Sequence, residues 1–253
     1  MIDKTTGTCS LLILLGLLVC LGGCASTESM LQEDRDPLEP YNRLMFQVND
    51  TLDKGAIKPL AKGYQAVLPE FIRNRVTNFF SNLGDISVIV NDALQGKGRQ
   101  ATMDFSRLVY NTTFGLGGLF DVATTLGLPK HNEDFGQTLG YWGVGEGYYL
   151  VLPFFGPSTT RDAWGVPVDN FLLNPVRYTD PLSLRYSLTG TNVVDKRANL
   201  LRVERAFEEA QVDPYSFRRQ AYLQRRRELT YDGHPPQPKL EFEEPETPAP
   251  PTQ

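Results

Sequence analysis

The feature that most constrains the fold is a glycine-rich apolar segment in the middle of the chain. Ten glycines lie between Gly115 and Gly156, with leucine, phenylalanine, tyrosine and tryptophan among the residues that separate them. The stretch from Tyr141 to Phe155 (YWGVGEGYYLVLPFF) is too apolar for a solvated loop and too rich in glycine for a good helix or strand. Because glycine permits sharp bends and close backbone approach, we expect irregular backbone, buried in protein or against lipid. A glycine-rich core with β-hairpins is the alternative.

Amphipathic helices are predicted before this segment. Apolar residues recur at steps of three and four over Leu38–Asp53, which indicates a helix. Pro59 is expected to break the chain after this helix, and Pro69 stands where it can open a second helix. Glycines at 96 and 98 are expected to end that helix. A further helix is predicted over about 100–112, with three apolar residues facing inward: Phe105, Leu108 and Val109.

Helices are also predicted after the glycine-rich segment. Ser158 can cap a short helix that begins near Thr159. The pattern is helical again from about 182 to 210, and Asp213 followed by Pro214 is typical of a helix start. The predicted fold class is therefore all-α, with helices interrupted by a glycine-rich irregular middle.

The N-terminus has the pattern of a secretion signal that ends at a cysteine. Leu11–Leu21 is an unbroken apolar run of 11 residues, about half the length that a helix needs to cross a membrane. Small residues then lead to Cys24, and Leu21–Cys24 is similar to the bacterial lipobox, in which the cysteine becomes the lipidated first residue. An ordinary signal peptide with an incidental cysteine is the alternative. The other cysteines, Cys9 and Cys20, fall in the removed segment, so we expect no internal disulfide.

The chain is therefore expected to divide into four parts. Residues 1–23 are predicted to be a signal peptide, 24–36 a lipidated tether, and 37–230 the helical domain. Residues 231–253 are rich in proline and glutamate and lack the apolar content to fold, which predicts a disordered tail.

Composition and motifs argue against several functions. The net charge of −5 is unsuited to a nucleic-acid binder. After the signal no run of 18 apolar residues occurs, so no membrane-spanning helix is predicted. The two histidines, His131 and His234, do not have metal-ligand spacing, and we predict neither a metal nor a cofactor.

Catalysis is not predicted either. Asp85 with Asp92, and Glu133 with Asp134, could in principle do acid–base work. Charged residues at such spacings usually mark a solvated helix face, and a Ser-His-Asp arrangement would have to use His131. We therefore expect a protein that is not an enzyme.

A cluster of arginines marks the last predicted helix. It could meet acidic lipid head groups or an acidic partner, or it could form a solvated face with local salt bridges. The sequence leaves both interpretations open for Arg218, Arg219, Arg225, Arg226 and Arg227.

A series of ordered motifs runs through the first two thirds of the predicted helical domain. These motifs include Asp36–Arg43, Asn78–Leu83, Leu94–Lys97, Asn111–Thr113, Gly117–Ala123, Glu133–Gly140, Trp142–Gly145 and Gly156–Ser158. Over about 36–169 they resemble the MlaA (VacJ) family of outer-membrane lipoproteins, and the likeness continues more weakly to Tyr222. Family members commonly have proline where this chain has Tyr148, which affects a local turn.

This resemblance implies a ring of helices around a central channel, lying in the inner leaflet of the outer membrane. Phospholipids misplaced in the outer leaflet would pass through the channel to a soluble periplasmic carrier, MlaC, and trimeric porins would hold the ring in place. The system would keep the outer membrane asymmetric. Ala25 follows the cysteine where aspartate would favour the inner membrane, so we expect lipid anchoring at the periplasmic face of the outer membrane. Interfacial helices need a wide apolar face but no full span.

The candidate channel lining consists of polar residues in the glycine-rich segment, because a phospholipid head group must cross polar surroundings. These residues are Asp121, Glu133, Asp134 and Glu146. Each could instead cap a helix or satisfy buried backbone amides. The candidate gating or loop residues are Gly143, Gly145, Gly147, Gln47 and Val48.

Two other functions remain open. One is a lipoprotein scaffold that binds a porin without transporting lipid. The other is a membrane-anchored lipid hydrolase, whose activity would depend on Glu146 or His131.

Overall fold

The computed structural model describes residues 36–208 and 213–236. Within these ranges the protein is mostly helical, with one two-stranded sheet. The predicted signal peptide, Cys24 and residues 237–253 of the predicted tail lie outside the described residues. The predicted all-α fold class is confirmed, because the described residues are mostly helical.

The first helix is longer than the sequence predicted. Helix α2 (Glu39–Leu52) continues through a π-helical turn, η2 (Asp53–Ile57), into α3 (Lys58–Val67). The expectation that Pro59 breaks the chain was wrong. Proline lacks the N–H that would bond four residues back, and the wider π turn lies directly before it, where regular α-helical bonding is already interrupted.

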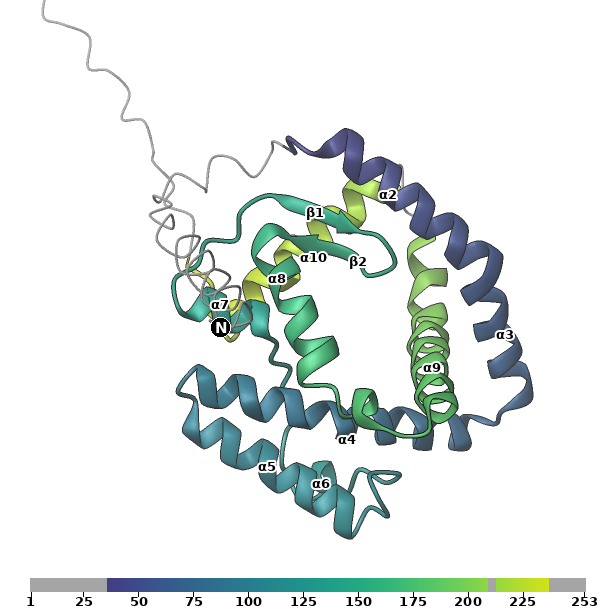
Figure 1. Cartoon of the computed structure of the whole chain (residues 1–253), viewed down its shortest axis with the longest axis vertical. Helices are drawn as coiled ribbons and strands as arrows, with labels where there is room; N and C mark the ends of the chain where they lie inside the picture. Colours follow the sequence, from purple (N-terminus) through teal and green to yellow (C-terminus); the bar gives the residue numbers. More distant parts are fainter. Residues whose placement is uncertain (1–35, 209–212, 237–253) are drawn as a thin grey trace, which may run out of the picture.

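Helices α4 (Glu70–Leu94) and α5 (Gly98–Thr113) lie side by side and are joined by a tight turn (Figure 1). Pro69 precedes α4 directly, as predicted. Gly96 ends the turn after α4 with a φ of 71°, a left-handed conformation that suits glycine. Gly98, which was expected to end a helix, instead begins α5.

The inward face predicted for α5 was wrong. Phe105 and Val109 are 55% and 41% exposed, and the buried residues of this helix are Asp104, Arg107 and Asn111. The prediction assumed that apolar residues turn away from the surroundings, as they do in water. Here the polar face is the one that packs against the rest of the protein.

The glycine-rich segment combines irregular turns with short elements. Helices α6 (Val122–Thr125) and α7 (Phe135–Tyr141) come first, and strands β1 (Tyr149–Leu152) and β2 (Gly156–Thr159) form an antiparallel hairpin. In the register Tyr149 faces Thr159 and Leu152 faces Gly156. The predicted irregular backbone is present, and the alternative with hairpins is right for one hairpin.

The C-terminal part begins with α8 (Thr160–Pro167), the π turn η3 (Val168–Leu172) and the 3₁₀ turn η4 (Pro175–Tyr178). Thr159, not Ser158, caps α8 by accepting a hydrogen bond from the amide of Asp162, because Ser158 belongs to β2. Two long helices come after these turns, α9 (Leu182–Glu208) and α10 (Pro214–Thr230). Asp213 caps α10, as the sequence predicted.

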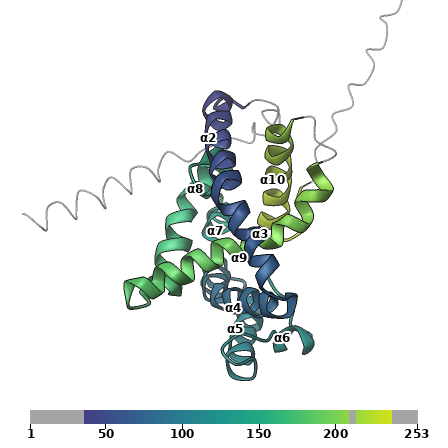
Figure 2. The ribbon, with the colours of Figure 1, turned by 90° about the vertical axis from the view of Figure 1, so that its right-hand side faces the viewer.

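Most of these elements are arranged in a ring (Figure 1). In that view β1, β2 and α10 form the upper part, α3 and α9 the right side, α4 the lower side and α8 the left. Helices α5 and α6 lie below α4, outside the ring. Turned by 90°, α9 runs obliquely across α3 (Figure 2), and the two helices are in contact.

Candidate functional site

The interior of the protein is polar. In the part of the chain that the structure describes, eighteen polar or charged residues are buried, against nine apolar ones. Two small apolar clusters are present: Ala61 with Ala198 and Leu201, and Tyr149 with Val151 and Tyr215. A water-soluble domain shows the opposite ratio, because apolar side chains dominate its core.

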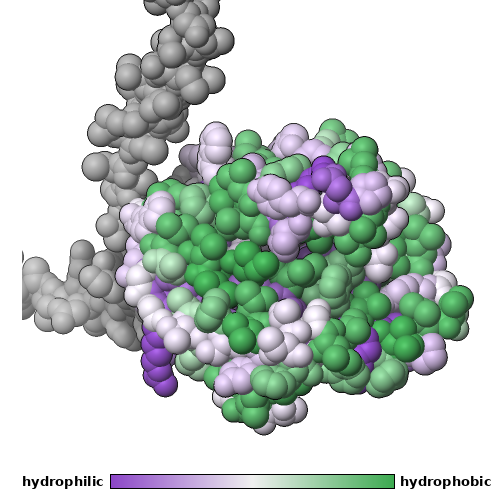
Figure 3. Space-filling view, turned by 60° about the horizontal axis from the view of Figure 1, so that its bottom comes forward, coloured by the Kyte–Doolittle hydropathy of each residue, from purple (hydrophilic) through white to green (hydrophobic). Residues whose placement is uncertain are grey.

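The exterior is correspondingly apolar. Among the exposed large apolar residues are Phe154 at 83%, Trp164 at 70% and Phe114 at 69% exposed. Apolar residues cover most of the face that carries α4 to α6 (Figure 3). Apolar patches of this extent mark surfaces that meet lipid or another protein. Among the described helices, none has both the length and the apolar character needed to cross a membrane.

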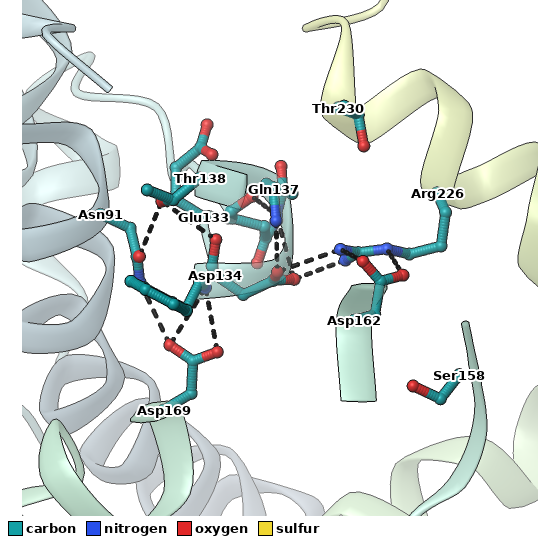
Figure 4. A network of polar contacts seen from close by, with 12 residues as sticks. Asn91, Glu133, Asp134, Gln137, Thr138, Ser158, Asp162, Asp169, Arg226 and Thr230 are labelled. Carbon is teal, nitrogen blue, oxygen red and sulfur yellow. Dashed lines mark hydrogen bonds and ion pairs between the residues drawn. The ribbon is translucent and has the colours of Figure 1, made fainter. Parts of the chain in front are cut away.

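The polar interior is centred on Arg226, which α10 brings between α7 and α8 (Figure 4). One of its nitrogens, Nη2, lies 3.0 Å from Asp134 Oδ1 and 2.9 Å from Asp162 Oδ1. The hydroxyl of Tyr222, one turn earlier on α10, donates to Asp162 over 2.9 Å. These bonds join the C-terminal helix to two elements of the ring.

Asp134 also caps α7 by accepting a hydrogen bond from the amide of Gln137 over 2.9 Å. Burial acts to raise the pKa of Asp134, but Arg226 and Gln137 outweigh burial and hold this pKa below its usual range. A Cβ on Gly136 would lie 2.6 Å from Asp162 Oδ1 and 2.9 Å from Arg226 Nη2. Glycine at position 136 therefore makes room for the ion cluster.

A chain of hydrogen bonds continues from α7 into α4 (Figure 4). Thr138 donates its hydroxyl to Asn91 over 2.8 Å, and the Asn91 amide donates to Asp169 Oδ1 over 3.2 Å. Asp169 also accepts the backbone N–H of Phe135 at 3.0 Å. Through Asn91 and Asp169, α4 and η3 are fixed to the start of α7.

Glu133 has three partners at the α4–α5 turn. It accepts from Gln95 at 2.9 Å, from Gln100 at 2.9 Å and from Lys97 at 3.1 Å. Its side chain is almost fully buried. The expectation that Glu133 marks a solvated face was wrong, and the same holds for Asp85 and Asp92 on α4, which are 1% and 0% exposed.

Asp121 caps α6 and pairs with Arg107 of α5. It accepts from the amide of Thr124 at 3.1 Å and from the Asn111 amide group at 3.1 Å, and Arg107 lies 3.2 Å away. Burial acts to raise the pKa of Asp121, yet the hydrogen bonds from Thr124 and Asn111 and the charge of Arg107 lower it below its usual range.

Glu146 differs from the other three candidate lining residues. Its atom Oε1 is buried and has no hydrogen-bond partner among the described residues. Burial raises the pKa of Glu146, with the charge of Arg161 acting in the opposite direction. Asp121 and Asp134 thus have capping roles, Glu133 is bound to side chains, and Glu146 keeps an oxygen free. A place in a channel lining stays a prediction for all four.

The candidate gating residues lie in two places. Gly143 and Gly147 have φ angles of 88° and 70°, and a Cβ on Gly147 would meet the Thr160 hydroxyl at 1.9 Å. These turns therefore require glycine. Gln47 and Val48 lie on α2 and are exposed. Their role in gating stays a prediction.

Sequence reasoning missed two asparagines on α2. Asn42 donates to the carbonyl of Tyr149 and accepts the N–H of Val151, at 3.0 and 2.8 Å. Asn49 makes the same pair of bonds with Leu152 and Phe154, at 2.9 and 2.8 Å. Each side-chain amide imitates the peptide group of a neighbouring strand. The signal that could have revealed them is two amides seven residues apart on one helical face.

The arginines of α10 do not act as one cluster. Arg226 is buried in the network with Asp134 and Asp162, whereas Arg218 is exposed and lies over the ring of Phe46, 5.0 Å from its centroid. Neither interpretation from the sequence anticipated a buried arginine.

A groove of about 500 Å³ opens at the α4–α5 turn. Two of its basic residues already have acidic partners, because Lys97 pairs with Glu133 and Asp232, and His131 with Asp104. Within the described ranges, no three histidine, cysteine or acidic residues come together as a metal site. The groove is lined by Gly96, Lys97, Gly98, Arg99, Gln100, Met103 and His131.

The chain is similar to proteins of one family. Residues 34–229 match the family model described as MlaA lipoprotein. A curated protein of Escherichia coli (strain K12), the intermembrane phospholipid transport system lipoprotein MlaA, is 38% identical over 211 residues, which are 81% of this chain and 82% of that protein. The Haemophilus influenzae protein of the same name is 32% identical over 222 residues, which are 85% and 88% of the two chains.

An uncharacterised protein of Rickettsia bellii is 35% identical over 195 residues, which are 77% of this chain and 76% of that protein. A solved structure, described as the structural basis for maintenance of bacterial outer membrane lipid asymmetry, superposes with a TM-score of 0.66 at 34% identity. The match covers 78% of this chain and 99% of the other.

Proposed function

This chain belongs to the MlaA lipoprotein family, and we propose on that premise that it removes phospholipids misplaced in the outer leaflet of the outer membrane. This activity would maintain the lipid asymmetry of that membrane. The E. coli relative is named as a lipoprotein of an intermembrane phospholipid transport system, and the solved structure concerns outer-membrane lipid asymmetry. Similar length and ordered motifs support transfer of this role to the whole chain.

The main support for the proposal is that the interior is polar and the surface apolar, the reverse of a water-soluble protein. Buried side chains are mostly polar and many exposed ones are large and apolar. Apolar surface gains about 25 cal/mol per Å² when it leaves water, so the stable place for this exterior is hydrocarbon. Because no described helix is suited to span a membrane, we propose that the ring lies in one leaflet, the periplasmic one, as interfacial helices do.

The proposed route for lipid is a channel bounded by the ring. A charged head group in bare hydrocarbon is costly, so it needs polar groups along its path. Glu146 is the best candidate to meet it, because one of its oxygens is not committed to a protein partner. Asp121, Glu133 and Asp134 would contribute by holding the wall in shape. The glycine turns at 143 and 147 would let the wall bend.

We propose that a lipid anchor and two protein partners position the ring. Lipid on Cys24, after removal of residues 1–23, would anchor the chain, and residues 24–36 would tether the ring that extends to residue 230. A trimeric porin would hold the ring in the membrane. The soluble carrier MlaC would receive the lipid on the periplasmic side.

The test measures phospholipid exposed on the surface of cells that lack the gene. Wild-type protein should lower it, and so should the control Thr102→Glu, which adds charge at a polar exposed position of α5. The double variant Phe105→Glu with Phe114→Glu should fail, because it places charge on the apolar exterior. The proposal is abandoned if loss of the gene leaves surface phospholipid unchanged.

A second measurement separates transport from scaffolding. Purified wild-type protein in liposomes should pass labelled phospholipid to the soluble carrier. Binding of a porin without any transfer of lipid would favour the scaffold. Release of fatty acid, abolished by Glu146→Gln or His131→Gln, would favour the hydrolase.

A further inference from the structure

Three aspartates meet between α4 and α5, away from the Arg226 network. Asp85 and Asp92 lie on α4, two turns apart, and Asp104 lies on the facing surface of α5. All three are buried, with exposed fractions of 1%, 0% and 0%. Asp92 is within hydrogen-bonding reach of Asp104. Two buried carboxyl groups therefore face each other at the contact between α4 and α5.

These carboxyl groups have too few partners among the described residues. Both oxygens of Asp92, Oδ1 of Asp104 and Oδ2 of Asp85 are buried without a hydrogen-bond donor. The other oxygen of Asp104 lies 2.7 Å from Nδ1 of His131, and that of Asp85 pairs with Lys130. A buried ionised carboxylate with two unpartnered oxygens is one of the most costly groups in a protein.

The surrounding charges do not neutralise the aspartates. Asp104 and Glu133 both act against ionisation of Asp92, and Lys97 favours it. Lys97 is shared between Glu133 and Asp232, and Arg107 is already paired with Asp121. The charged groups that act on Asp85, Asp92 and Asp104 are Glu133, Lys97, Arg107, Lys130 and His131. Two further acids, Asp121 and Asp232, pair with Arg107 and Lys97.

Acids exceed bases even when every base carries its charge. Asp232 is 52% exposed, so water stabilises its charge. The five remaining acids still outnumber the four bases, and His131 counts as a base only when it is protonated. The cluster therefore has an excess of negative charge, which disfavours ionisation of its buried members. Asp92 is the member most disfavoured, because it has no basic side chain bound to it among the described residues.

We propose that Asp92 and Asp104 share one proton, which joins α4 to α5 and makes this joint sensitive to pH. The carboxyl group of Asp92 donates to Oδ1 of Asp104, while Oδ2 of Asp104 keeps the loop residue His131 in place. Loss of the proton puts two like charges in contact at a buried helix interface. The contact between α4 and α5 then separates. The contact of Asp104 with His131, in the loop that leads into α7, is lost with it.

Burial, followed by the charge of Asp104, raises the pKa of Asp92 to about 8. The ordinary pKa of an aspartate in the unfolded chain is 3.8. Since the folded state keeps its proton where the unfolded state has lost it, the contribution of this pair to stability is complete below pH 4. It falls as the pH rises from about 4 to about 8 and is constant above that.

The direct test is infrared spectroscopy of the full-length protein in detergent micelles at pH 6.5. Wild type should show the carbonyl band of a protonated carboxylic acid, which disappears on titration to pH 9.5. Asp92→Asn should lack the band and keep the fold, because its amide can donate permanently to Asp104. Asp180→Asn is the control, since Asp180 is 89% exposed and should leave the band unchanged.

Thermal unfolding gives an independent readout. Wild type should lose about 3 °C in Tm per pH unit relative to Asp92→Asn between pH 5 and pH 8. If Asp92→Asn fails to fold, Asp104→Asn serves in both experiments and should also lack the band. The proposal is overturned if wild type has no band at pH 6.5, if the band survives in both variants, or if Asp92→Asn keeps the wild-type pH slope.

Discussion

The α3–α9 side of the ring and the side built from α4, α7, α8 and α10 are held together by different interactions. Between α3 and α9, the apolar residues Ala61, Ala198 and Leu201 are all buried. One buried carboxylate, Asp195 of α9, accepts a hydrogen bond from the Tyr64 hydroxyl of α3 over 2.9 Å. Ion pairs such as Arg197 with Asp53 lie at the edge of this contact, 13% and 25% exposed. On the other side, buried charges occupy the centre, as Arg226 does between Asp134 and Asp162.

Substitutions on the two sides of the ring should therefore destabilise the protein in different ways. An apolar contact weakens in proportion to the surface that is lost. A buried ion network fails more abruptly, because removal of one member leaves charges without partners. The ion pairs on the polar side also need closely fixed distances. Glycines at 136 and 140 leave space for the charged side chains, since a Cβ at either position would lie within 3 Å of one of them.

The largest effect is expected for Arg226→Met, which leaves Asp134 without its cation and leaves the buried Asp162 with Arg161 alone. The free energy of unfolding should fall by about 3–5 kcal/mol, measured by denaturant unfolding in detergent. Arg225→Met, on the same helix but exposed, is the control and should change stability by less than about 0.5 kcal/mol. Equal effects of the two variants would show that the network does not hold α10.

A smaller loss is expected on the apolar side for Leu201→Ala. Its side chain is 5% exposed, and truncation leaves a cavity beside Ala61. We expect a loss of about 2–3 kcal/mol. Leu200→Ala is the control, because Leu200 is 58% exposed, and in micelles it should be nearly neutral. A loss from Leu200→Ala as large as that from Leu201→Ala would contradict the proposed packing.

Gly136→Ala tests the geometry of the polar side. Its Cβ would lie 2.6 Å from Asp162 Oδ1, so the ion pairs must shift, at a cost of about 1–3 kcal/mol. Gly84→Ala in the middle of α4 is the control. Nothing lies near the added Cβ there, and alanine should stabilise the helix by about 0.5–1 kcal/mol. The two glycine variants should thus have effects of opposite sign.

Acid should lower the stability of the wild-type protein through protonation of Asp134, and Asp134→Asn should remove this contribution to the pH dependence. Because the pKa of Asp134 is held below its usual range, its contribution to stability is present above pH 4 and is lost as the pH falls further. Asp134→Asn should be less stable than wild type at pH 6, and the difference in Tm should shrink towards pH 3. A difference that stays constant from pH 6 to pH 3 would rule out this linkage.

The sequence predicted those helices whose signals are local. Pro69 before α4 and Asp213 before α10 lie next to the elements that they start. The helix α3 was missed because proline was taken as a break, although a first-turn position tolerates it. The prediction of an apolar inward face on α5 was wrong because it assumed that the protein is surrounded by water.

The polar network could not be predicted from spacing. Asp134 and Arg226 are 92 residues apart, and Asn42 and Val151 are 109 apart. Charged residues at helical spacing usually face water, and only the fold shows that Asp85 and Asp92 face another helix. A long-range pairing of this kind leaves no periodic trace in the sequence.

We expect the apolar exterior to lie in lipid while the charged residues are enclosed by the ring. Spin labels on single cysteines at 105, 114 and 164 test it most directly, in liposomes, with a label at the exposed Arg225 for comparison. The three apolar positions should be relaxed by lipid-soluble oxygen and protected from a water-soluble nickel chelate, in contrast to position 225. Equal access of the chelate to all four positions would show that the apolar exterior does not lie in lipid.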